Sequence, residues 1–385
     1  MLNKKKILMV AMPSLHFFRW VDQLKNSDFD VYWFDITGAG NNIKRISWIH
    51  QITNWKMRWD FPGRIFIKSK FPKLCQVISK WNERNLSKEF EKTITEIQPD
   101  LVHSFALYVS CTPILAVMEN YKNLKWIYSS WGSDLFYFQN NPDYLADIKQ
   151  VLKRVNCLMT DCKRDFKIAE NHGFTGKFLG VFPGGGGFDL EQLNSYKKSK
   201  EERNIILIKG YQGRSGRAIP VLKAVLKLKG ELQSYQIVVF GADPEVFQWV
   251  NQTVLINWDN FKIFGKITHN EVLKLMGKSK IYIGNSNSDG MPNTLLEAIC
   301  MDVFPIQSNP GGVTEEIIAH GKNGLLISEC EDVDEITSLL KQFFQNRNNK
   351  WYSVNNHTLK QSLDFNFVKK STLRVYNSIL NQNAK

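Results

Sequence analysis

The sequence lacks several features that would place it in a narrow class at once. Its six cysteines include no Cys-x-x-Cys pair, so neither a disulfide framework nor a zinc knuckle is indicated. No apolar run approaches the roughly 18–20 residues that a membrane-crossing helix needs. Acidic residues number 37 against 50 lysines and arginines, which leaves a net charge of +13. These absences exclude a disulfide-stapled miniprotein and favour a reducing compartment.

What is present indicates a folded protein of two domains. Apolar residues make up 43% of the 385-residue chain, too many for a charged disordered chain. The positive charge permits a nucleic acid, an anionic membrane or a phosphorylated substrate as partner. Three lysines and the run ILMVAM resemble a signal peptide, but Pro13 interrupts the run, so we expect a buried first strand. We predict a protein that is cytoplasmic, with peripheral association at the inner face of the plasma membrane as the alternative.

Short apolar runs alternate with helix-length segments along the whole chain. The runs are KILMVAM, DVYWFDI, DLVHSF, KWIYSSW, CLMTDC and GKFLGVFP, then NIILIKGY, QIVVFGA, FKIFGKI, KIYIGNS, VFPIQS and GLLIS. Strands that are each followed by a helix-length connection predict parallel sheets. Ligands bind outside the carboxyl ends of such strands. The predicted fold is therefore α/β, with two Rossmann-like domains facing a central cleft.

A change of composition separates the two halves. Four glycines at 184–187 precede the polar, lysine-rich segment EQLNSYKKSKEERN. We predict a first domain over residues 1–188, a linker over 189–203 and a second domain over 204–360. A C-terminal helix over 361–385 is expected to pack back on the first domain.

The segment 281–328 carries the most chemical information. Its strand ends in a polar loop with Asp289 and Gly290, and Pro292 suits a first helical turn because that position needs no N–H. The free N–H groups that follow, together with the helix dipole, form an anion site suited to phosphate. Glu297, one turn into the helix, can reach groups just beyond that anion, such as ribose hydroxyls.

The same segment resembles a known family. Asp289-Gly-Met-Pro-Asn-Thr-Leu-Leu-Glu297 is followed by Pro305, Gly311-Gly312, Glu315 or Glu316, and Gly321-x-x-Gly324. This series is similar to the acidic-x7-Glu signature of retaining glycosyltransferases of the GT-B fold, the family 4-like or group 1 glycosyltransferases. The first acid is an aspartate where the family usually has glutamate, and its shorter arm bears on donor identity.

The resemblance implies roles for individual residues. Glu297 would bind the ribose of a nucleotide sugar, and Asn293 and Thr294 would lie near its diphosphate. The donor sugar would meet Asp289 and the backbone of residues 290–293, which are Gly290, Met291, Pro292 and Asn293. The alternative is an ordinary strand-loop-helix in which Glu297 is a solvated acid.

A diphosphate leaving group also needs cations. Lys209, Arg214 and Arg217 lie on a predicted loop between a strand and a helix, which resembles the family's Arg and Lys pair. Which two of the three act stays open, as does the alternative of a solvated basic loop. The resemblance further implies that backbone groups around Lys266 and Ile267 read the nucleobase.

Two strand-end motifs of the first half, PDLVHSF and YSSWGSDL, also resemble the family's. Asp134 matches the family's Asp, and Trp131 replaces its His. We predict that Asp134 and His103 lie beside the donor sugar and are catalytic residues together with Asp289. The alternative for His103 is a structural role, which is common for a lone His. His16, Arg19 and Trp131 are predicted to face the acceptor; alternatively, Arg19 is simply solvated.

Residues 42–86 concentrate positive charge, with ten basic and two acidic residues. Among these cations lie aromatic residues, namely Trp48, Trp55, Trp59, Phe61, Phe66 and Phe71. This pairing is typical of an element lying on an anionic leaflet. The same residues could bind a nucleic acid through stacking and phosphate contacts. The third interpretation is a solvated helical face whose aromatic residues lie in the core.

Three further patterns favour structural roles. Asp332-Val-Asp334 spells a metal-binding Asp-x-Asp but precedes a predicted helix, where acids cap the first turn. The glycines at 184–187 have no Lys-Ser or Lys-Thr after them, and fall where the family has its hinge. Cys157 and Cys162 lack metal-ligand spacing and are expected to be buried thiols.

The resemblance thus implies a hexosyltransferase. Its donor would be a UDP- or GDP-linked sugar and its acceptor a glycan or lipid-linked sugar, with retention of configuration and no metal or other cofactor. The pathway would be surface polysaccharide or glycoconjugate biosynthesis, and nucleic acid is disfavoured as partner. The alternatives are a degenerate transferase fold acting as a basic membrane- or nucleic-acid-binding module, and an epimerase or phosphorylase on the same fold.

Overall fold

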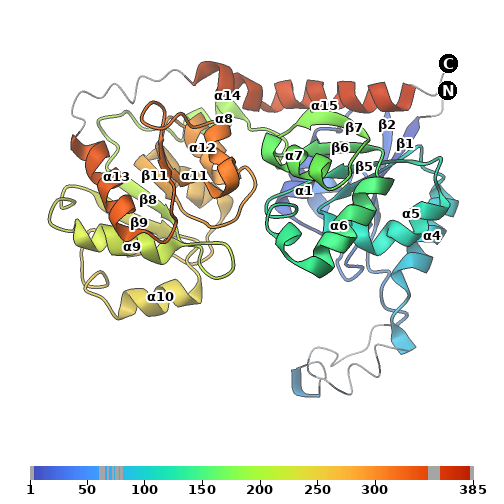
Figure 1. Cartoon of the computed structure of the whole chain (residues 1–385), viewed down its shortest axis with the longest axis horizontal. Helices are drawn as coiled ribbons and strands as arrows, with labels where there is room; N and C mark the ends of the chain where they lie inside the picture. Colours follow the sequence, from blue (N-terminus) through green and yellow to red (C-terminus); the bar gives the residue numbers. More distant parts are fainter. Residues whose placement is uncertain are drawn as a thin grey trace. The chain divides into compact units, whose positions relative to one another are not determined.

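The computed structural model describes residues 4–59, 66, 69–71, 73, 78, 81–345 and 356–381. It divides into two compact units. Unit 1 comprises Met1–Asp161, Asp165–Gly186 and Lys369–Lys385, and unit 2 comprises Cys162–Arg164 and Gly187–Val368. Each unit contains one parallel sheet with crossover helices (Figure 1). The predicted α/β fold with two Rossmann-like domains is confirmed.

Unit 1 is built on a seven-stranded sheet in the order β3-β2-β1-β4-β5-β6-β7. Its strands are β1 (Lys5–Ala11), β2 (Phe29–Asp35), β3 (His50–Ile52), β4 (Leu101–Phe105), β5 (Lys125–Ser129), β6 (Cys157–Thr160) and β7 (Lys177–Val181). Neighbouring strands pair in parallel, and the order reverses between β1 and β4. Such a reversal opens a crevice at the carboxyl ends of the two strands.

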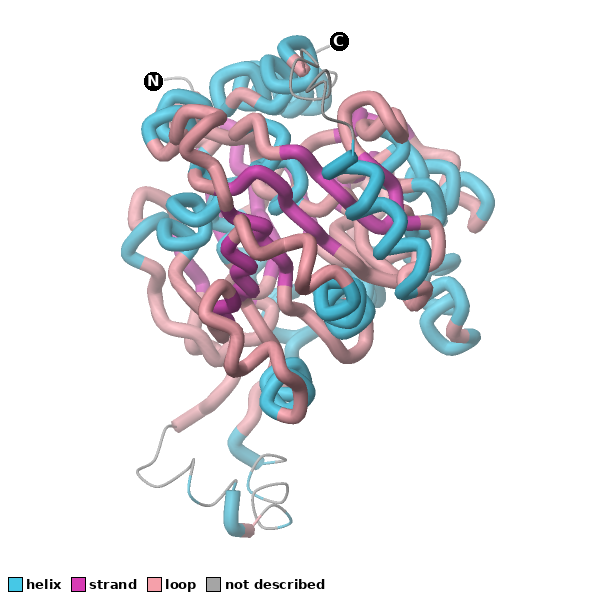
Figure 2. Tube along the Cα trace, turned by 90° about the vertical axis from the view of Figure 1, so that its left-hand side faces the viewer, coloured by secondary structure: helices cyan, strands magenta, loops and turns pink. Residues whose placement is uncertain are grey.

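The inner strands of unit 1 are apolar on both faces because helices cover both sides of the sheet. The helices are α1 (Leu15–Asp22), α4 (Leu86–Ile97), α5 (Leu115–Asn120), α6 (Pro142–Arg154) and most of α7 (Lys163–Asn171). A core including Leu8, Val102, Trp126 and Leu158 lies between them. Figure 2 shows helices and loops around the strands. Within the described residues, no helix is both long enough and apolar enough to cross a bilayer.

Unit 2 repeats this plan with six strands in the order β10-β9-β8-β11-β12-β13. The strands are β8 (Ile205–Lys209), β9 (Gln236–Phe240), β10 (Phe261–Ile263), β11 (Ser279–Gly284), β12 (Phe304–Ser308) and β13 (Leu325–Ile327). The helices are α8 (Leu190–Ser195), α9 (Ala218–Lys227), α10 (Pro244–Asn251), α11 (His269–Gly277), α12 (Asn293–Cys300), α13 (Val333–Gln345) and α14 (His357–Leu363). The strand order reverses between β8 and β11.

The segment 189–203, predicted to be a linker, is instead part of unit 2. It forms α8, whose Leu193 is buried in the core of that unit. The Arg203 guanidinium is also buried and donates to the carbonyls of Met301 and Asp302, each at 3.0 Å. The polar composition of the segment therefore reflects one exposed face and does not mark an unstructured connection.

The last helix, α15 (Phe365–Leu380), belongs to unit 1 from Lys369 onward. The Tyr376 hydroxyl lies 2.6 Å from Nδ1 of His103 and accepts a hydrogen bond from Nε1 of Trp20 at 3.2 Å. Lys125 donates to the carbonyl of Ile379 at 2.8 Å. A fully buried tyrosine thus joins α15 to β4 and α1.

We predict that Tyr376→Phe destabilises the protein by about 1–3 kcal/mol, because His103 and Trp20 both lose a buried hydrogen-bond partner. The measurement is urea denaturation followed by tryptophan fluorescence. The matched control is Tyr121→Phe, whose hydroxyl has only a 3.5 Å contact with Thr95 and is partly exposed. Equal stabilities of the two variants would contradict the assigned role of Tyr376.

Candidate active site

Two loops of unit 2 are joined where its strand order reverses. In the loop after β8, the backbone N–H of Arg217 donates to the Asn285 carbonyl of the loop after β11 at 2.9 Å. Asn285 Nδ2 donates back to the Arg217 carbonyl, also at 2.9 Å, and Gly216 bridges Ser286. A Cβ at Gly216 would lie 2.2 Å from the Tyr211 carbonyl oxygen, so only glycine fits there. The structure thus brings the two predicted donor segments together.

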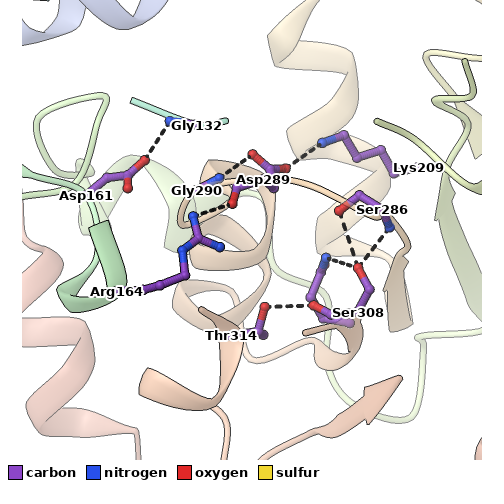
Figure 3. A network of polar contacts seen from close by, with 10 residues as sticks. Gly132, Asp161, Arg164, Lys209, Ser286, Asp289, Gly290, Ser308 and Thr314 are labelled. Atoms are coloured by element: carbon purple, nitrogen blue, oxygen red, sulfur yellow. Dashed lines mark hydrogen bonds and ion pairs between the residues drawn. The ribbon is translucent and has the colours of Figure 1, made fainter. Parts of the chain in front are cut away.

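A cation and an acid lie close to each other at this junction. Nζ of Lys209, the last residue of β8, is 3.9 Å from Oδ2 of Asp289 and 4.5 Å from the ring centroid of Tyr211. Asp289 Oδ1 accepts a hydrogen bond from the N–H of Gly290 at 2.9 Å (Figure 3). Both charged side chains are only partly exposed, Lys209 at 19% and Asp289 at 28%. The arrangement leaves both groups within reach of a ligand.

Helix α12 begins directly after this loop. Pro292 occupies the N-cap position, with φ −68° and ψ 120°, one residue before the first helical turn where the sequence placed it. A proline side chain cannot accept a hydrogen bond, so it leaves the first N–H groups of α12 to another acceptor. Met291 is buried, while Asn293 and Thr294 are partly exposed. The role of this helix start as an anion site stays a prediction.

Glu297 lies one turn into α12 and is only 4% exposed. Its Oε1 is 2.7 Å from Nε2 of His269, the first residue of α11. The alternative in which Glu297 is a solvated acid is therefore wrong. Sequence reasoning missed His269, although it follows the predicted base-binding turn directly and Thr268 and Glu271 mark a capping box around it.

The remaining predicted donor residues lie at the edges of this site. The guanidinium of Arg217 contacts Glu331 through Nε, and its Nη1 donates to the Gly213 carbonyl at 2.7 Å. Arg214 is exposed on the same loop. Lys266 is exposed between β10 and α11, and Ile267 is half-buried. The roles of these four residues stay predictions.

Arg164, missed by the sequence analysis, holds the loop that carries Asp289. Its guanidinium donates to the carbonyl of Asp289 at 2.8 Å (Figure 3). It also donates to the carbonyl of Pro310 at 2.7 Å. Glu316 accepts hydrogen bonds from the backbone N–H groups of Lys163 and Arg164 at 2.8 and 2.9 Å. Of the two glutamates left open by the motif, Glu316 therefore anchors the Cys162–Arg164 segment of unit 2.

A second polar contact supports the loop after β11 from the neighbouring strand. The N–H of Ser286 donates to Oγ of Ser308, the last residue of β12, at 2.8 Å. Thr314 Oγ1 donates to the Ser308 carbonyl at 2.7 Å (Figure 3). Because these groups are buried, the loop is held from both adjacent strands.

In unit 1, the structure corrects the role predicted for His103. The ring is completely buried in the middle of β4, with Nδ1 2.6 Å from the Tyr376 hydroxyl and Nε2 2.8 Å from Oγ of Ser129. Burial lowers the pKa of His103 from 6.5 to about 3. Both ring nitrogens are engaged by protein groups, so the structural interpretation is the right one.

Asp134 is also buried, at 2% exposed, and not open to a donor sugar. Its Oδ2 accepts hydrogen bonds from the N–H of Leu107 at 2.7 Å and the hydroxyl of Tyr128 at 2.5 Å. Burial raises the pKa of Asp134 from 3.8 to about 7. The carboxyl group holds the chain just after Ala106, whose φ of +65° is strained for a residue other than glycine. Its role is therefore to fix the end of β4.

Two of the three predicted acceptor residues lie together near the carboxyl end of the unit 1 sheet. The rings of His16 and Trp131 meet edge to face, with centroids 6.3 Å apart. The Trp131 ring also lies 4.8 Å from that of Phe105, the last residue of β4. Arg19 is half-buried one turn along α1 from His16. The aromatic pair leaves His16 exposed and Trp131 partly exposed.

The basic aromatic segment of unit 1 divides into two parts. Trp55 is in the core, stacked on Phe34 with centroids 5.0 Å apart. Trp59, Phe66 and Phe71 are each more than half exposed. Phe61 and several of the cations, namely Arg64, Lys68 and Lys80, lie outside the described residues. The interpretation that places all the aromatics in the core is therefore wrong.

The structure places the three patterns that the sequence assigned to structural roles. Asp332 Oδ1 accepts from the N–H groups of Asp334 and Glu335 at 2.8 and 3.0 Å, and so caps α13. Cys157 and Cys162 are buried and belong to no disulfide. The chain passes from unit 1 to unit 2 within the glycine run at 184–187.

Two doubly wound parallel sheets, the second with polar groups gathered at its reversal point, define the GT-B class of fold. A family model described as Glycosyl transferases group 1 matches residues 191–357, and one described as Glycosyl transferase 4-like matches residues 6–162. The chain belongs to the group 1 glycosyltransferases with the GT-B fold, as the resemblance of segment 281–328 indicated.

Curated relatives match about half of the chain. GalNAc-alpha-(1->4)-GalNAc-alpha-(1->3)-diNAcBac-PP-undecaprenol alpha-1,4-N-acetyl-D-galactosaminyltransferase of Campylobacter jejuni is 23% identical over 49% of this chain and 52% of that protein. The phosphatidylinositol N-acetylglucosaminyltransferase gpi3 subunit of Schizosaccharomyces pombe is 22% identical over 50% of this chain and 42% of that protein. The chain spans about half the length of these relatives.

Solved structures share the fold over nearly the whole chain. Sucrose-phosphate synthase from Thermosynechococcus elongatus has a TM-score of 0.71 and 13% identity, covering 98% of this chain and 100% of that one. Anabaena HepE in complex with UDP and glucose has a TM-score of 0.69 and 13% identity, covering 97% and 100%. At such identities the likeness is one of fold.

His103 and Asp134 affect stability in opposite directions as the pH changes. Between pH 6.5 and about 3 the unfolded chain binds a proton on His103 that the folded protein excludes, so this group lowers stability as the pH falls. Between pH 3.8 and about 7 the folded protein keeps a proton on Asp134 that the unfolded chain has lost. This second group lowers stability as the pH rises.

We therefore predict opposite changes in two variants between pH 4 and pH 6.5. In His103→Gln the melting temperature rises less steeply with pH than in the wild type, because glutamine binds no proton in the unfolded chain. In Asp134→Asn it rises more steeply. The measurement is a thermal melt at each pH. Slopes that are unchanged in both variants would show that the two groups do not titrate as assigned.

Proposed function

We propose that this protein is a glycosyltransferase that moves a sugar from a nucleotide sugar to a lipid-linked or glycan acceptor. One observation carries the proposal. Lys209, Asp289, the start of α12 and the buried Glu297 lie together at the reversal point of the unit 2 sheet. A nucleoside diphosphate needs a cation, backbone N–H groups and an acceptor for its ribose hydroxyls, and this site has all three.

Each group then has one task. Glu297 accepts hydrogen bonds from the ribose, and the backbone around Lys266 and Ile267 reads the base. Lys209 and the first N–H groups of α12 stabilise the charge on the diphosphate, together with Arg214 or Arg217. Asp289 orients the donor sugar. Anabaena HepE has been solved in complex with UDP and with UDP-glucose, which supports a UDP-linked donor.

The transfer breaks the bond between the anomeric carbon and the diphosphate oxygen. The acceptor hydroxyl forms its new bond on the same face of the sugar, and its proton passes to the leaving phosphate oxygen. Configuration is then retained, and no side chain is needed as a base. We propose further that protein cations serve in place of a metal, because Lys209, Arg214 and Arg217 supply positive charge where the diphosphate develops its own.

For the acceptor, the names of both curated relatives point to lipid-linked substrates, an undecaprenol diphosphate and phosphatidylinositol. We place the acceptor sugar against His16 and Trp131 of unit 1, since exposed ring faces suit the apolar faces of sugars. The product would be a surface polysaccharide or another glycoconjugate.

The donor site is tested by Glu297→Gln. We predict that UDP binding weakens roughly 10- to 100-fold, because a charge-assisted hydrogen bond to the ribose is worth about 1.5–3 kcal/mol. The measurement is thermal stabilisation by a panel of nucleoside diphosphates and nucleotide sugars, followed by release of diphosphate with and without EDTA.

The matched control is Glu245→Gln, an exposed acid in the first turn of α10. If no nucleotide stabilises the wild type, or if Glu297→Gln binds as well as Glu245→Gln, the assigned donor site is wrong. If EDTA abolished the release of diphosphate, only the proposal of metal-independent transfer would be contradicted, and the assigned donor site would stand.

Membrane association is a separate part of the proposal. We predict that replacing the exposed Trp59, Phe66 and Phe71 by serine weakens binding to phosphatidylglycerol vesicles at least roughly tenfold, because each ring buries apolar area in the leaflet. The control is the serine double variant of Val254 and Ile256, which are exposed apolar residues of unit 2. Equal sedimentation of both variants with the vesicles would reject the segment as a membrane contact.

A further inference from the structure

The contact between His269 and Glu297 is short and joins two helices. Nε2 of His269, at the start of α11, lies 2.7 Å from Oε1 of Glu297 in α12. We propose that His269 is a positioning residue of the donor site, which holds the Glu297 carboxylate in the orientation that binds the ribose hydroxyls. The inference rests on the proposed function, because it concerns the same nucleotide.

The two side chains differ in exposure. The Glu297 side chain is 5% exposed and that of His269 is 33% exposed. A carboxylate removed from water needs hydrogen-bond donors to be tolerated there. His269 supplies one of them from the more exposed side of the pair. Fixing Oε1 also fixes the plane of the carboxylate, and with it the direction from which a hydroxyl can donate.

The backbone of His269 is itself fixed. The Thr268 hydroxyl accepts from the N–H of Glu271 at 3.3 Å, and Glu271 Oε2 accepts from the N–H of Thr268 at 2.8 Å. This capping box sets the first turn of α11, where His269 is the first residue. The backbone that carries the imidazole is therefore rigid, as a positioning residue requires.

The same turn carries the predicted base-binding residues. Lys266 and Ile267 come directly before the cap, and Ile267 packs against the core that contains Leu295 and Leu296 of α12. A single turn thus supplies the backbone that reads the base and the side chain that orients the ribose acceptor. Recognition of the two parts of the nucleoside is coupled through His269.

The test compares nucleotides with and without ribose hydroxyls. His269→Ala is expected to weaken UDP binding about tenfold, the equivalent of about 1.4 kcal/mol, and to leave binding of 2′,3′-dideoxy-UDP unchanged. His269→Gln, whose amide can donate to the same oxygen, is expected to restore most of the affinity. In a Glu297→Gln background, His269→Ala is expected to add little further loss.

The control is His357→Ala, an exposed histidine of α14 in the same unit. In assays of transfer, His269→Ala is expected to raise the KM for the donor and leave kcat unchanged. Should His269→Ala not fold, His269→Asn replaces it, because that side chain is too short to reach Glu297.

Equal losses for UDP and its dideoxy analogue would overturn the proposal, since His269 would then have only a structural role. Unchanged UDP binding in His269→Ala would overturn it as well. If the wild type binds neither UDP nor GDP, both the proposed function and the role of His269 are wrong. If the wild type binds a nucleotide of the panel but His269→Ala binds it equally well, only the role of His269 is wrong.

Discussion

The hydrogen bonds between Arg217 and Asn285 hold the candidate donor site together. They join the loops that follow β8 and β11, the two strands between which the order of the unit 2 sheet reverses. At such a reversal the helices that follow the strands cover opposite faces, so the loops would otherwise separate. The paired loops carry Lys209 and Asp289, whose side chains lie within 4 Å of each other.

Local pattern made most of the fold predictable. Each predicted apolar run forms a strand, because a parallel strand covered on both faces is apolar throughout. Strand β3 escaped prediction because its three residues, His50–Ile52, are exposed or half-buried at the sheet edge. His103 was assigned a catalytic role although its place inside an apolar run already indicated the core. Its neighbours Leu101 and Val102 are fully buried, and so is the imidazole.

The site was predictable where its residues are close in sequence. Asp289, Pro292 and Glu297 belong to one strand-loop-helix, and their spacing carries their geometry. His269 and Arg164 contribute through contacts with residues 28 and 125 positions away, and no local pattern encodes such a pairing. Both support another group of the site: His269 holds the Glu297 carboxylate, and Arg164 holds the backbone of Asp289.

Arg164 binds the Asp289 carbonyl. The Asp289 carboxylate accepts a hydrogen bond from the N–H of Gly290 at 2.9 Å and lies 3.9 Å from Nζ of Lys209, which is longer than a hydrogen bond. Two unit charges 4 Å apart attract by about 1 kcal/mol in water and by about 4 kcal/mol at an effective dielectric constant of 20. A diphosphate carries more charge than one carboxylate and can accept a direct hydrogen bond from the ammonium group. Lys209 is therefore held near its proposed ligand by a partner that the ligand can displace, while the loop itself stays anchored through its backbone.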